Sequence, residues 1–303
     1  MKIVNLHAGL GNQLYIYVYF RWLQERCTDD ECIVNSSIYD DPRYAKYYGM
    51  GRAFGVTFPR LRDKFSPAAW DEIRKQSENV HMVTLLERLG LGNFSIVSES
   101  VAYEESFANV ELREADYRVD NGAYNKESAD IKGNVWYHGY WHTTHYYRAA
   151  FEAISKELEF TPVTDDFNKR MIDTIDSVNS VAVHIRTYSH ADGEEDAKFG
   201  LGKSFYYYAV NKMRSYLDKP TWFVFTDNLD RVQKSLADYG FIAGDKIVVV
   251  DGNSGDNDFR DMQLMSLCKH MVMPNSSFSM SAAMLNKNTQ KLIIRPNRYL
   301  DIF

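Results

Sequence analysis

Small hydrogen-bonding side chains gather where an apolar run ends, in the segment VMPNSSFSMSAAML. One Asn or Ser is enough to cap a helix, because its oxygen accepts a hydrogen bond from an N–H of the first turn. Several such side chains also favour a bound anion, since a helix N-terminus carries free donors and a positive dipole end. The residues that follow Pro274 and open this predicted helix are Asn275, Ser276, Ser277, Phe278 and Ser279.

A second group of polar side chains follows the apolar run in VAVHIRTYSH. His184 and Arg186 lie at the carboxyl end of this predicted strand. An arginine there costs solvation energy unless an anion meets it, and its planar fork of donors matches a phosphate. A salt bridge to a nearby aspartate would satisfy Arg186 equally well, so both interpretations stay open.

Two aspartates lie at the ends of predicted elements. Asp227, in FTDN, lies at a strand end, and Asp261, in FRDMQLMSLCKH, lies at a helix start. The helix dipole alone favours a carboxylate in a first turn. A carboxylate can also accept two parallel N–H bonds from the edge of guanine. Both interpretations of Asp261 are compatible with the pattern.

The segment HAGLGNQ lies at the first predicted strand-to-helix turn. Gly9 and Gly11 allow a ligand to approach the backbone closely, and Asn12 and Gln13 put amide donors at the helix start. A dinucleotide fingerprint is incomplete, because Leu14 stands where its third glycine is required. A tight turn with a helix cap is the alternative.

Two groups of potential metal ligands have weaker patterns. Asp256 and Asp258 have the D-x-D spacing of some metal-dependent nucleotide-sugar enzymes, but their loop is rich in Gly, Asn and Ser and we expect it to be solvated. His138, His142 and His145 have no Cys or carboxylate partner at a usual zinc spacing. We expect no metal and no cofactor, and an aromatic patch that faces a sugar or a second domain.

The elements that must position these residues alternate between strand and helix in the second half of the chain. Short apolar strands in such an alternation indicate a parallel sheet covered on both faces. The predicted strands are 180–185, 221–226, 246–250, 270–274 and 291–295, and the predicted helices are 204–217, 229–240, 259–270 and 278–286.

The first half also begins with a strand and a helix. Its predicted strands are 2–6, 32–35, 94–97 and 134–138, and its predicted helices are 12–27, 68–76 and 146–160. The segment TPVTDD that follows is the best linker. We therefore expect an α/β protein with two Rossmann-like domains, 1–160 and 161–303, facing across a cleft that holds ligands at the carboxyl ends of the strands.

The composition narrows the class of protein. The chain has 303 residues, 45% of them apolar and 25% charged, which is typical of a globular protein. Its net charge of −6 argues against nucleic-acid binding. The 21 tyrosines suit either polar flat ligands such as sugars or large cores. Three cysteines, no signal peptide and no membrane span predict a cytoplasmic protein with at most peripheral membrane contact.

Several stretches resemble one known family. GLGNQLYIYVYFRWL, HIR and DMQLMSLCKHMVMPNSSFSMSAAML are similar to segments of the bacterial α-1,2-fucosyltransferases of glycosyltransferase family 11. HGYWHTTHYYRAAF is similar to that family's G-Y-(F/W)-Q-x-x-x-Y-F segment. The resemblance implies a fold of the GT-B type and no metal. It also implies inverting transfer of L-fucose from GDP-β-L-fucose to the 2-hydroxyl of galactose, in a bacterial surface glycan such as an O-antigen. The acceptor would be a galactose-terminated oligosaccharide or a lipid-linked glycan.

The resemblance also assigns roles to the polar residues. The loop 275–279 would hold the GDP diphosphate, Arg186 would neutralise it, and His184 would lie beside the nucleotide. Asp261 would read guanine, and Asn12 would contact the diphosphate or the fucose. Such fixed donors stabilise the charge that develops as GDP leaves. The expected donor-binding residues are Asn12, Gln13, His184, Arg186, Asp227, Asp261, Asn275, Ser276, Ser277, Phe278 and Ser279.

The chain departs from the family pattern H-x-R-R-x-D, because Thr187 and Ser189 replace the second Arg and the Asp. An inverting transfer also needs a general base. Related fucosyltransferases of another family place a Glu ten residues after the equivalent His, so we expect Glu194 as the base, with Asp192 next. The other candidates in this loop are His190, Glu195 and Asp196.

Two alternatives remain at this point: transfer from another GDP-sugar, and a catalytically silent protein that binds a glycan or GDP. The sequence predicts neither the acceptor linkage nor the oligomeric state.

Overall fold

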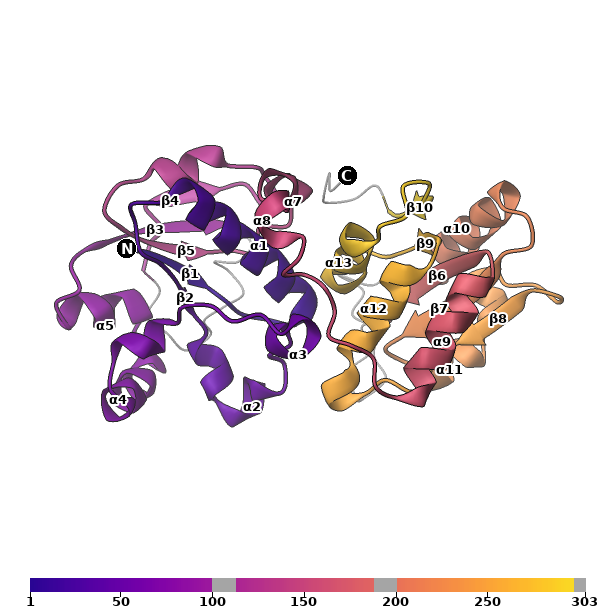
Figure 1. The fold of residues 1–303 in the computed structure, drawn as a ribbon, viewed down its shortest axis with the longest axis horizontal. Helices are drawn as coiled ribbons and strands as arrows, with labels where there is room; N and C mark the ends of the chain where they lie inside the picture. Colours follow the sequence, from indigo (N-terminus) through magenta and orange to yellow (C-terminus); the bar gives the residue numbers. More distant parts are fainter. Residues whose placement is uncertain (100–112, 188–200, 297–303) are drawn as a thin grey trace. The chain divides into compact units, whose positions relative to one another are not determined.

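The computed structural model describes residues 1–99, 113–187 and 201–296. It divides into two compact units, Met1–Glu159 and Phe160–Tyr299 (Figure 1). The boundary expected from the sequence, between residues 160 and 161, lies one residue from this division. Across the described residues, no helix combines the length and apolar character that crossing a membrane requires.

The first unit contains a five-stranded parallel sheet in the order β2-β1-β5-β3-β4. Its strand β1 pairs Lys2 with Cys32 on one side and with Val135 on the other. The strands are β1 (Lys2–Asn5), β2 (Cys32–Asn35), β3 (Phe94–Glu99), β4 (Tyr117–Val119) and β5 (Asn134–His138).

Helices cover both faces of this sheet. On one face α1 packs against β1, α7 and α8. On the other, Ile3, Ile96 and Trp136 meet Trp70 of α4 and Leu86 of α5 in a single apolar cluster. The helices are α1 (Leu10–Arg26), α2 (Pro42–Ala45), α3 (Met50–Phe54), α4 (Pro67–Ser77), α5 (Met82–Arg88), α7 (Thr144–Ala149) and α8 (Phe151–Ile154), with 3-10 turns at Ser37–Asp40, Leu61–Lys64 and Lys126–Asp130.

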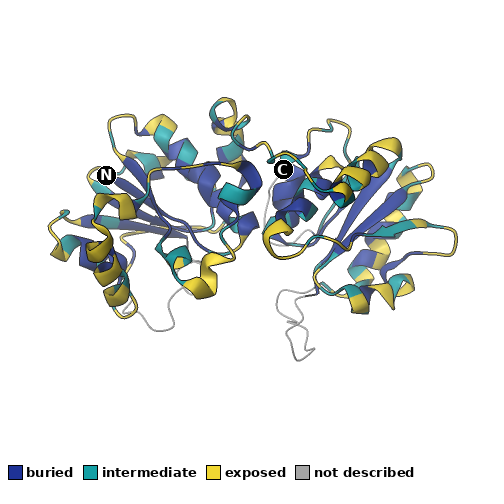
Figure 2. Ribbon diagram, turned by 60° about the horizontal axis from the view of Figure 1, so that its bottom comes forward, coloured by how far each residue is buried: buried dark blue, intermediate teal, exposed yellow. Residues whose placement is uncertain are grey.

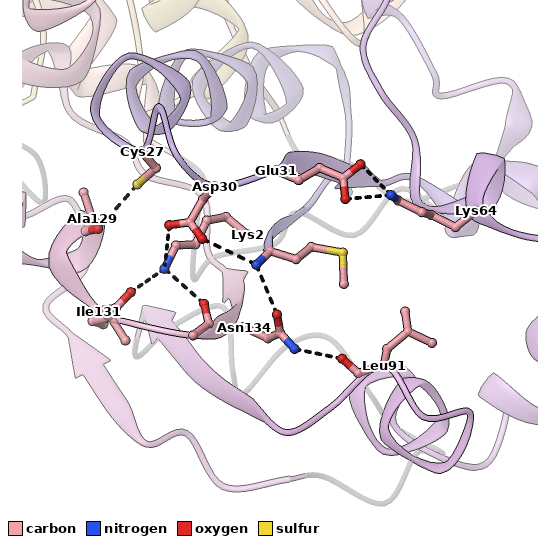
Figure 3. A network of polar contacts seen from close by, with 11 residues as sticks. Lys2, Cys27, Asp30, Glu31, Lys64, Leu91, Ala129, Ile131 and Asn134 are labelled. Carbon is pink, nitrogen blue, oxygen red and sulfur yellow. Dashed lines mark hydrogen bonds and ion pairs between the residues drawn. The ribbon is translucent and has the colours of Figure 1, made fainter.

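A buried lysine ties the amino edge of this sheet together (Figure 3). The Nζ of Lys2 donates to the carbonyl oxygens of Ile131 and Gly133 and lies 3.6 Å from a carboxylate oxygen of Asp30. The terminal ammonium donates to Oδ1 of Asn134 at 3.1 Å. A buried charge is tolerated only when such partners replace water, so the polar residues at this edge are accounted for by the fold.

The second unit contains a five-stranded parallel sheet in the order β10-β9-β6-β7-β8. The inner strands are buried, whereas the helices keep exposed outer faces (Figure 2). The elements are α9 (Asp166–Ser177), β6 (Ser180–Ile185), α10 (Lys203–Tyr216), β7 (Thr221–Thr226), α11 (Leu229–Gln233), β8 (Lys246–Val249), α12 (Phe259–Leu267), β9 (His270–Val272), α13 (Ser277–Leu285) and β10 (Ile293–Ile294), with 3-10 turns at Leu236–Tyr239 and Gly255–Asn257.

The prediction of an α/β protein with two Rossmann-like domains is confirmed by these two sheets, but two helix predictions are wrong. The predicted helix 229–240 ends at Gln233 and resumes as a 3-10 turn. Its Ser235 hydroxyl donates to the carbonyl of Arg231, and such a bond competes with the helical ladder. The predicted helix 146–160 is broken at Ala150, where φ is −109° and ψ is 14°, and its second part, α8, ends at Ile154.

Candidate functional site

The strand order of the second unit contains one reversal. From β6 the chain adds β7 and β8 on one side, and then places β9 and β10 on the other side of β6. In open parallel sheets, ligands bind outside the carboxyl ends of the strands at such a switch point. His184 and Arg186 lie at the end of β6, and the segment 275–279 follows β9, so the two polar groups lie on either side of the switch point between these strands.

His184 lies near the end of β6, where its side chain is 5% exposed. Its ring centroid lies 6.2 Å from that of Phe278, which links the two sides of the switch point. Burial, followed by the charge of Arg186, lowers the pKa of His184 from 6.5 to about 4, so the ring is neutral at pH 7. Its Nδ1 has no hydrogen-bond partner among the described residues, which leaves a buried polar atom available to a ligand.

Arg186 forms the salt bridge that was one of its two predicted interactions. Its Nη1 lies 3.2 Å from Oδ2 of Asp227. The other carboxylate oxygen, Oδ1, accepts hydrogen bonds from the N–H and the hydroxyl of Thr187, at 2.8 and 3.0 Å. Thr187 therefore fixes Asp227, and Asp227 orients Arg186, whose side chain is 41% exposed.

The N-terminus of α13 is suited to an anion. Its N-cap is Ser276, which makes no side-chain hydrogen bond to the first turn. The hydroxyl of Ser279 donates instead to the carbonyl of Ser276 at 3.2 Å. The early N–H groups of a helix have no intrahelical acceptor, and the N-cap side chain does not supply one here.

Asp261 lies in the first turn of α12, and α12 packs against α13. Burial raises the pKa of Asp261 from 3.8 to about 7, a hydrogen bond from Asn253 opposes this shift, and the charges of Asp258 and Asp251 add to it. A carboxylate that is held out of water in this way gains more than an exposed one from an N–H donor of a ligand.

The first unit repeats the same arrangement. Its chain adds β2 on one side of β1 and later inserts β5 on the other side, so the switch point lies between β1 and β5. His7 follows β1, His138 ends β5, and their rings stack with centroids 4.9 Å apart. The Nδ1 of His138 lies 2.9 Å from Nδ2 of Asn5, whose Oδ1 accepts from Asn35. Polar residues at three strand ends thus share one hydrogen-bonded edge.

Asn12 and Gln13, both in the first turn of α1, have different environments. The Oδ1 of Asn12 lies 2.9 Å from Nε2 of His142. Gln13 is fully buried. It donates to the carbonyls of Ala8 and Tyr47 at 2.7 and 2.6 Å and accepts from the N–H of Gly49 at 2.9 Å. Gln13 therefore anchors the loop before α3, and its contact with the donor stays a prediction.

A buried carboxylate holds the turn that carries His142. The Oε2 of Glu99 accepts hydrogen bonds from the N–H groups of Tyr140 and Trp141, at 2.6 and 2.8 Å. Burial raises the pKa of Glu99, and the N–H donors oppose this shift. A Cβ at Gly139 would lie 2.8 Å from that same Oε2, so the close approach requires glycine.

The last residues to place are the potential metal ligands and the predicted general bases. Within the part of the chain that the structure describes, no group of three or more His, Cys, Asp or Glu could hold a metal ion. The independence from metal stays a prediction. The predicted bases Glu194 and Asp192, with His190, Glu195, Asp196 and the substituted Ser189, lie outside the described residues.

Three contributors to these sites were not identified from the sequence: Glu99, Thr187 and Asn253. Glu99 ends the strand FSIVSE, so a polar residue at the end of an apolar strand was a usable signal. In the sequence Thr187 is only a departure from the family pattern, and its hydrogen bonds to Asp227 are visible only in the structure. Nothing in the loop around Asn253 distinguishes it from its polar neighbours.

Comparison with known proteins identifies the family of this chain. The family model "Glycosyl transferase family 11" matches residues 97–303. An α-1,2-colitosyltransferase of Escherichia coli is 29% identical over 304 residues, which cover 99% of this chain and 92% of that protein. Two Rossmann-like units together with this match define a glycosyltransferase. More narrowly, the chain belongs to glycosyl transferase family 11, which confirms the resemblance.

Solved structures are similar at a lower level. The fucosyltransferase NodZ from Bradyrhizobium has a TM-score of 0.45 at 14% identity, with 94% of this chain and 92% of that chain covered. A mutant of Arabidopsis thaliana FUT1 in complex with GDP has a TM-score of 0.49 at 12% identity, with 98% and 71% covered.

Proposed function

We propose that this glycosyltransferase transfers L-fucose from GDP-β-L-fucose to the 2-hydroxyl of a galactose, with inversion at the anomeric carbon. The acceptor would be a galactose-terminated oligosaccharide or a lipid-linked glycan of a bacterial surface polysaccharide. The observation that carries the donor assignment is the position of Arg186 and the N-terminus of α13 at one switch point. An arginine fork and a helix start are both suited to a diphosphate.

The step itself is a displacement. The acceptor oxygen bonds to the anomeric carbon as the bond from that carbon to the β-phosphate oxygen breaks, and GDP leaves with the electron pair. The hydroxyl proton passes to a general base. Arg186 and the N–H donors of α13 stabilise the charge that grows on GDP, so they act most strongly in the transition state.

A second donor has specific support. The 29% identical relative is a colitosyltransferase, so transfer of colitose from a GDP-sugar is the alternative within the same site. The two functions share Asp261, Arg186 and the α13 N-terminus, which would meet the nucleotide. The two functions differ in the sugar that the rest of the site would accept.

A panel assay tests these proposals. The protein is incubated with GDP-fucose, GDP-colitose or GDP-mannose and a series of galactosides, and both GDP release and glycoside formation are measured. Fucoside formation supports the proposed function, and colitoside formation in its place supports the alternative. Binding of GDP without turnover of any donor would instead indicate a silent binding protein. Activity should persist in excess EDTA, and a loss that Mn²⁺ restores would contradict metal independence.

A further inference from the structure

A row of hydrogen-bonded side chains joins the start of α9 to the start of α12. It begins at Asp165, the N-cap of α9, which accepts hydrogen bonds from the backbone N–H of Asn168 at 2.8 Å and from its Nδ2 at 3.1 Å. The side chain of Asn168 is almost fully buried. Because a carboxylate only accepts, Asp165 fixes the orientation of the Asn168 amide, with its nitrogen toward Asp165.

Asn168 passes this orientation to Asn253. The Nδ2 of Asn168 donates to Oδ1 of Asn253 at 2.8 Å, and the Nδ2 of Asn253 donates back to Oδ1 of Asn168 at 3.1 Å. The Nδ2 of Asn253 also donates to Oδ1 of Asp261, at 2.8 Å. Both donor positions of the Asn253 amide are therefore used, and the amide cannot rotate without breaking these bonds.

Asp261 receives one fixed hydrogen bond from this row, at Oδ1. The charged groups that act on its carboxylate, Asp251 and Asp258, are both acidic and disfavour its ionised form, while Asn253 favours it. The adjacent Arg260 gives no compensation, because its guanidinium donates to the carbonyls of Thr161 and Pro162.

We propose that Asn253 is a positioning residue for guanine recognition: it fixes the plane of the Asp261 carboxylate so that the two oxygens can accept N1–H and N2–H of the base together. The proposal rests on the proposed function, since it requires a guanine nucleotide at Asp261. Asn168 and Asp165 act one and two steps further away, by fixing the orientation of Asn253.

The test compares two nucleotides that differ only in the second contact. Inosine diphosphate lacks the exocyclic amino group of GDP, so it offers N1–H but no N2–H. Affinities for GDP and inosine diphosphate are measured by calorimetry on the full chain. We expect Asn253→Ala to weaken GDP about tenfold and inosine diphosphate by clearly less, so that the preference for GDP falls. Asn257→Ala, at an exposed asparagine of the same loop, is the matched control and should keep the preference.

An equal loss for both nucleotides would show that Asn253 only supports the loop, and an unchanged GDP affinity would show that it does not act on Asp261; either result overturns the inference. Should Asn253→Ala fold poorly, Asn168→Ala keeps Asn253 in place but frees its amide, and the same fall in preference is expected. If the unmodified protein binds no GDP at all, the proposed function fails together with the inference. If it binds GDP and only the preference is unaffected, the inference alone fails.

Discussion

The Nε2 atom of His142 lies 2.9 Å from the Oδ1 atom of Asn12, across 130 residues of chain. Burial lowers the pKa of His142 to about 4, so the ring is neutral at pH 7. Because the amide oxygen of Asn12 can only accept, the His142 tautomer that bonds to it carries its proton on Nε2 and donates. The amide nitrogen of Asn12 is then turned away from His142. In the ligand contact that the sequence predicts, Asn12 would therefore offer its amide nitrogen as a hydrogen-bond donor, which suits a phosphate or a sugar oxygen.

The first prediction concerns this pair. His142→Leu removes the donor and should lower kcat/KM about tenfold, because the Asn12 amide loses its fixed orientation. His142→Gln should retain most activity, since its side-chain amide can donate to Asn12 and the family pattern has glutamine there. In an Asn12→Ala background, His142→Leu should cost little more, because the group that it positions is already gone.

The control for this pair is His145→Gln, at an exposed histidine of the same segment, which should leave kcat/KM unchanged. A full additional loss from His142→Leu in the Asn12→Ala background would contradict the positioning role.

The second prediction concerns Arg186. Arg186→Ala should lower kcat by roughly a hundredfold or more, the scale of losing one main charge stabiliser, while the unfolding midpoint stays near that of the unmodified protein. Asp227→Asn should have a smaller effect in the same direction, because the arginine keeps its charge but loses its orientation. Arg170→Ala, at an exposed arginine of α9, is the control. Turnover near normal in Arg186→Ala would refute the role.

Strand β6 illustrates how far the sequence predicts this fold. The prediction 180–185 matches it residue for residue, because all six side chains are buried and a short apolar run has one stable environment. The carboxyl-edge position of His184 and Arg186 follows from that prediction. The position of β9 beside β6 does not follow, because strand order depends on how the whole sheet packs. The partners of the site residues were hidden for the same reason: Asp227 and Thr187 lie 40 residues apart, and Asn253 and Asn168 lie 85 apart.

The third prediction concerns the general base, which stays an expectation from the sequence. Glu194→Gln keeps the shape of the side chain and removes its basicity. Turnover should fall by roughly a hundredfold to ten-thousandfold, while GDP affinity measured by calorimetry is retained. If Asp192→Asn has this effect and Glu194→Gln does not, the assignment within the loop is wrong. Normal turnover in both variants would place the base elsewhere.

The fourth prediction concerns stability at low pH. His81 is the N-cap of α5, its Nδ1 accepts from the N–H of Val83, and burial lowers its pKa from 6.5 to about 4. The unfolded chain therefore binds a proton between these pH values that the folded chain excludes, and the free energy of unfolding falls as pH drops from about 6.5 to about 4. The change from this one group is on the order of 3 kcal/mol.

His81→Asn tests this directly, because asparagine caps a helix and does not titrate. The variant should lose packing against Trp136 and be less stable at pH 7.5, but its stability should decline less steeply toward pH 5 than that of the unmodified protein. His145→Asn, at an exposed position, should leave the slope unchanged. Parallel curves for His81→Asn and the unmodified protein, measured by denaturant unfolding at each pH, would contradict the shift.

The last prediction joins stability and binding at Asp261, whose pKa is about 7 in the folded protein against an ordinary value of 3.8. Between these values the folded protein holds a proton that the unfolded chain has released, so the free energy of unfolding falls as pH rises through this range and levels off above about 7. Asp261→Asn removes this dependence. Without ligand, the variant should be more stable than the unmodified protein at pH 8, and the difference should shrink toward pH 5.

GDP affinity should change in the opposite direction, because only the ionised carboxylate accepts both N1–H and N2–H of guanine. The affinity of the unmodified protein should rise from pH 6 to pH 8 by up to about tenfold per pH unit below the pKa. The phosphate of GDP also titrates in this range, and the affinity of Asp261→Asn for GDP measures that contribution. The ratio of the affinity of the unmodified protein to that of Asp261→Asn therefore isolates the carboxylate. A ratio that does not change with pH would show that Asp261 does not meet the base as a carboxylate. A rising ratio with a stabilised variant would mean that the fold keeps a carboxylate in an unfavourable environment for the ligand it binds.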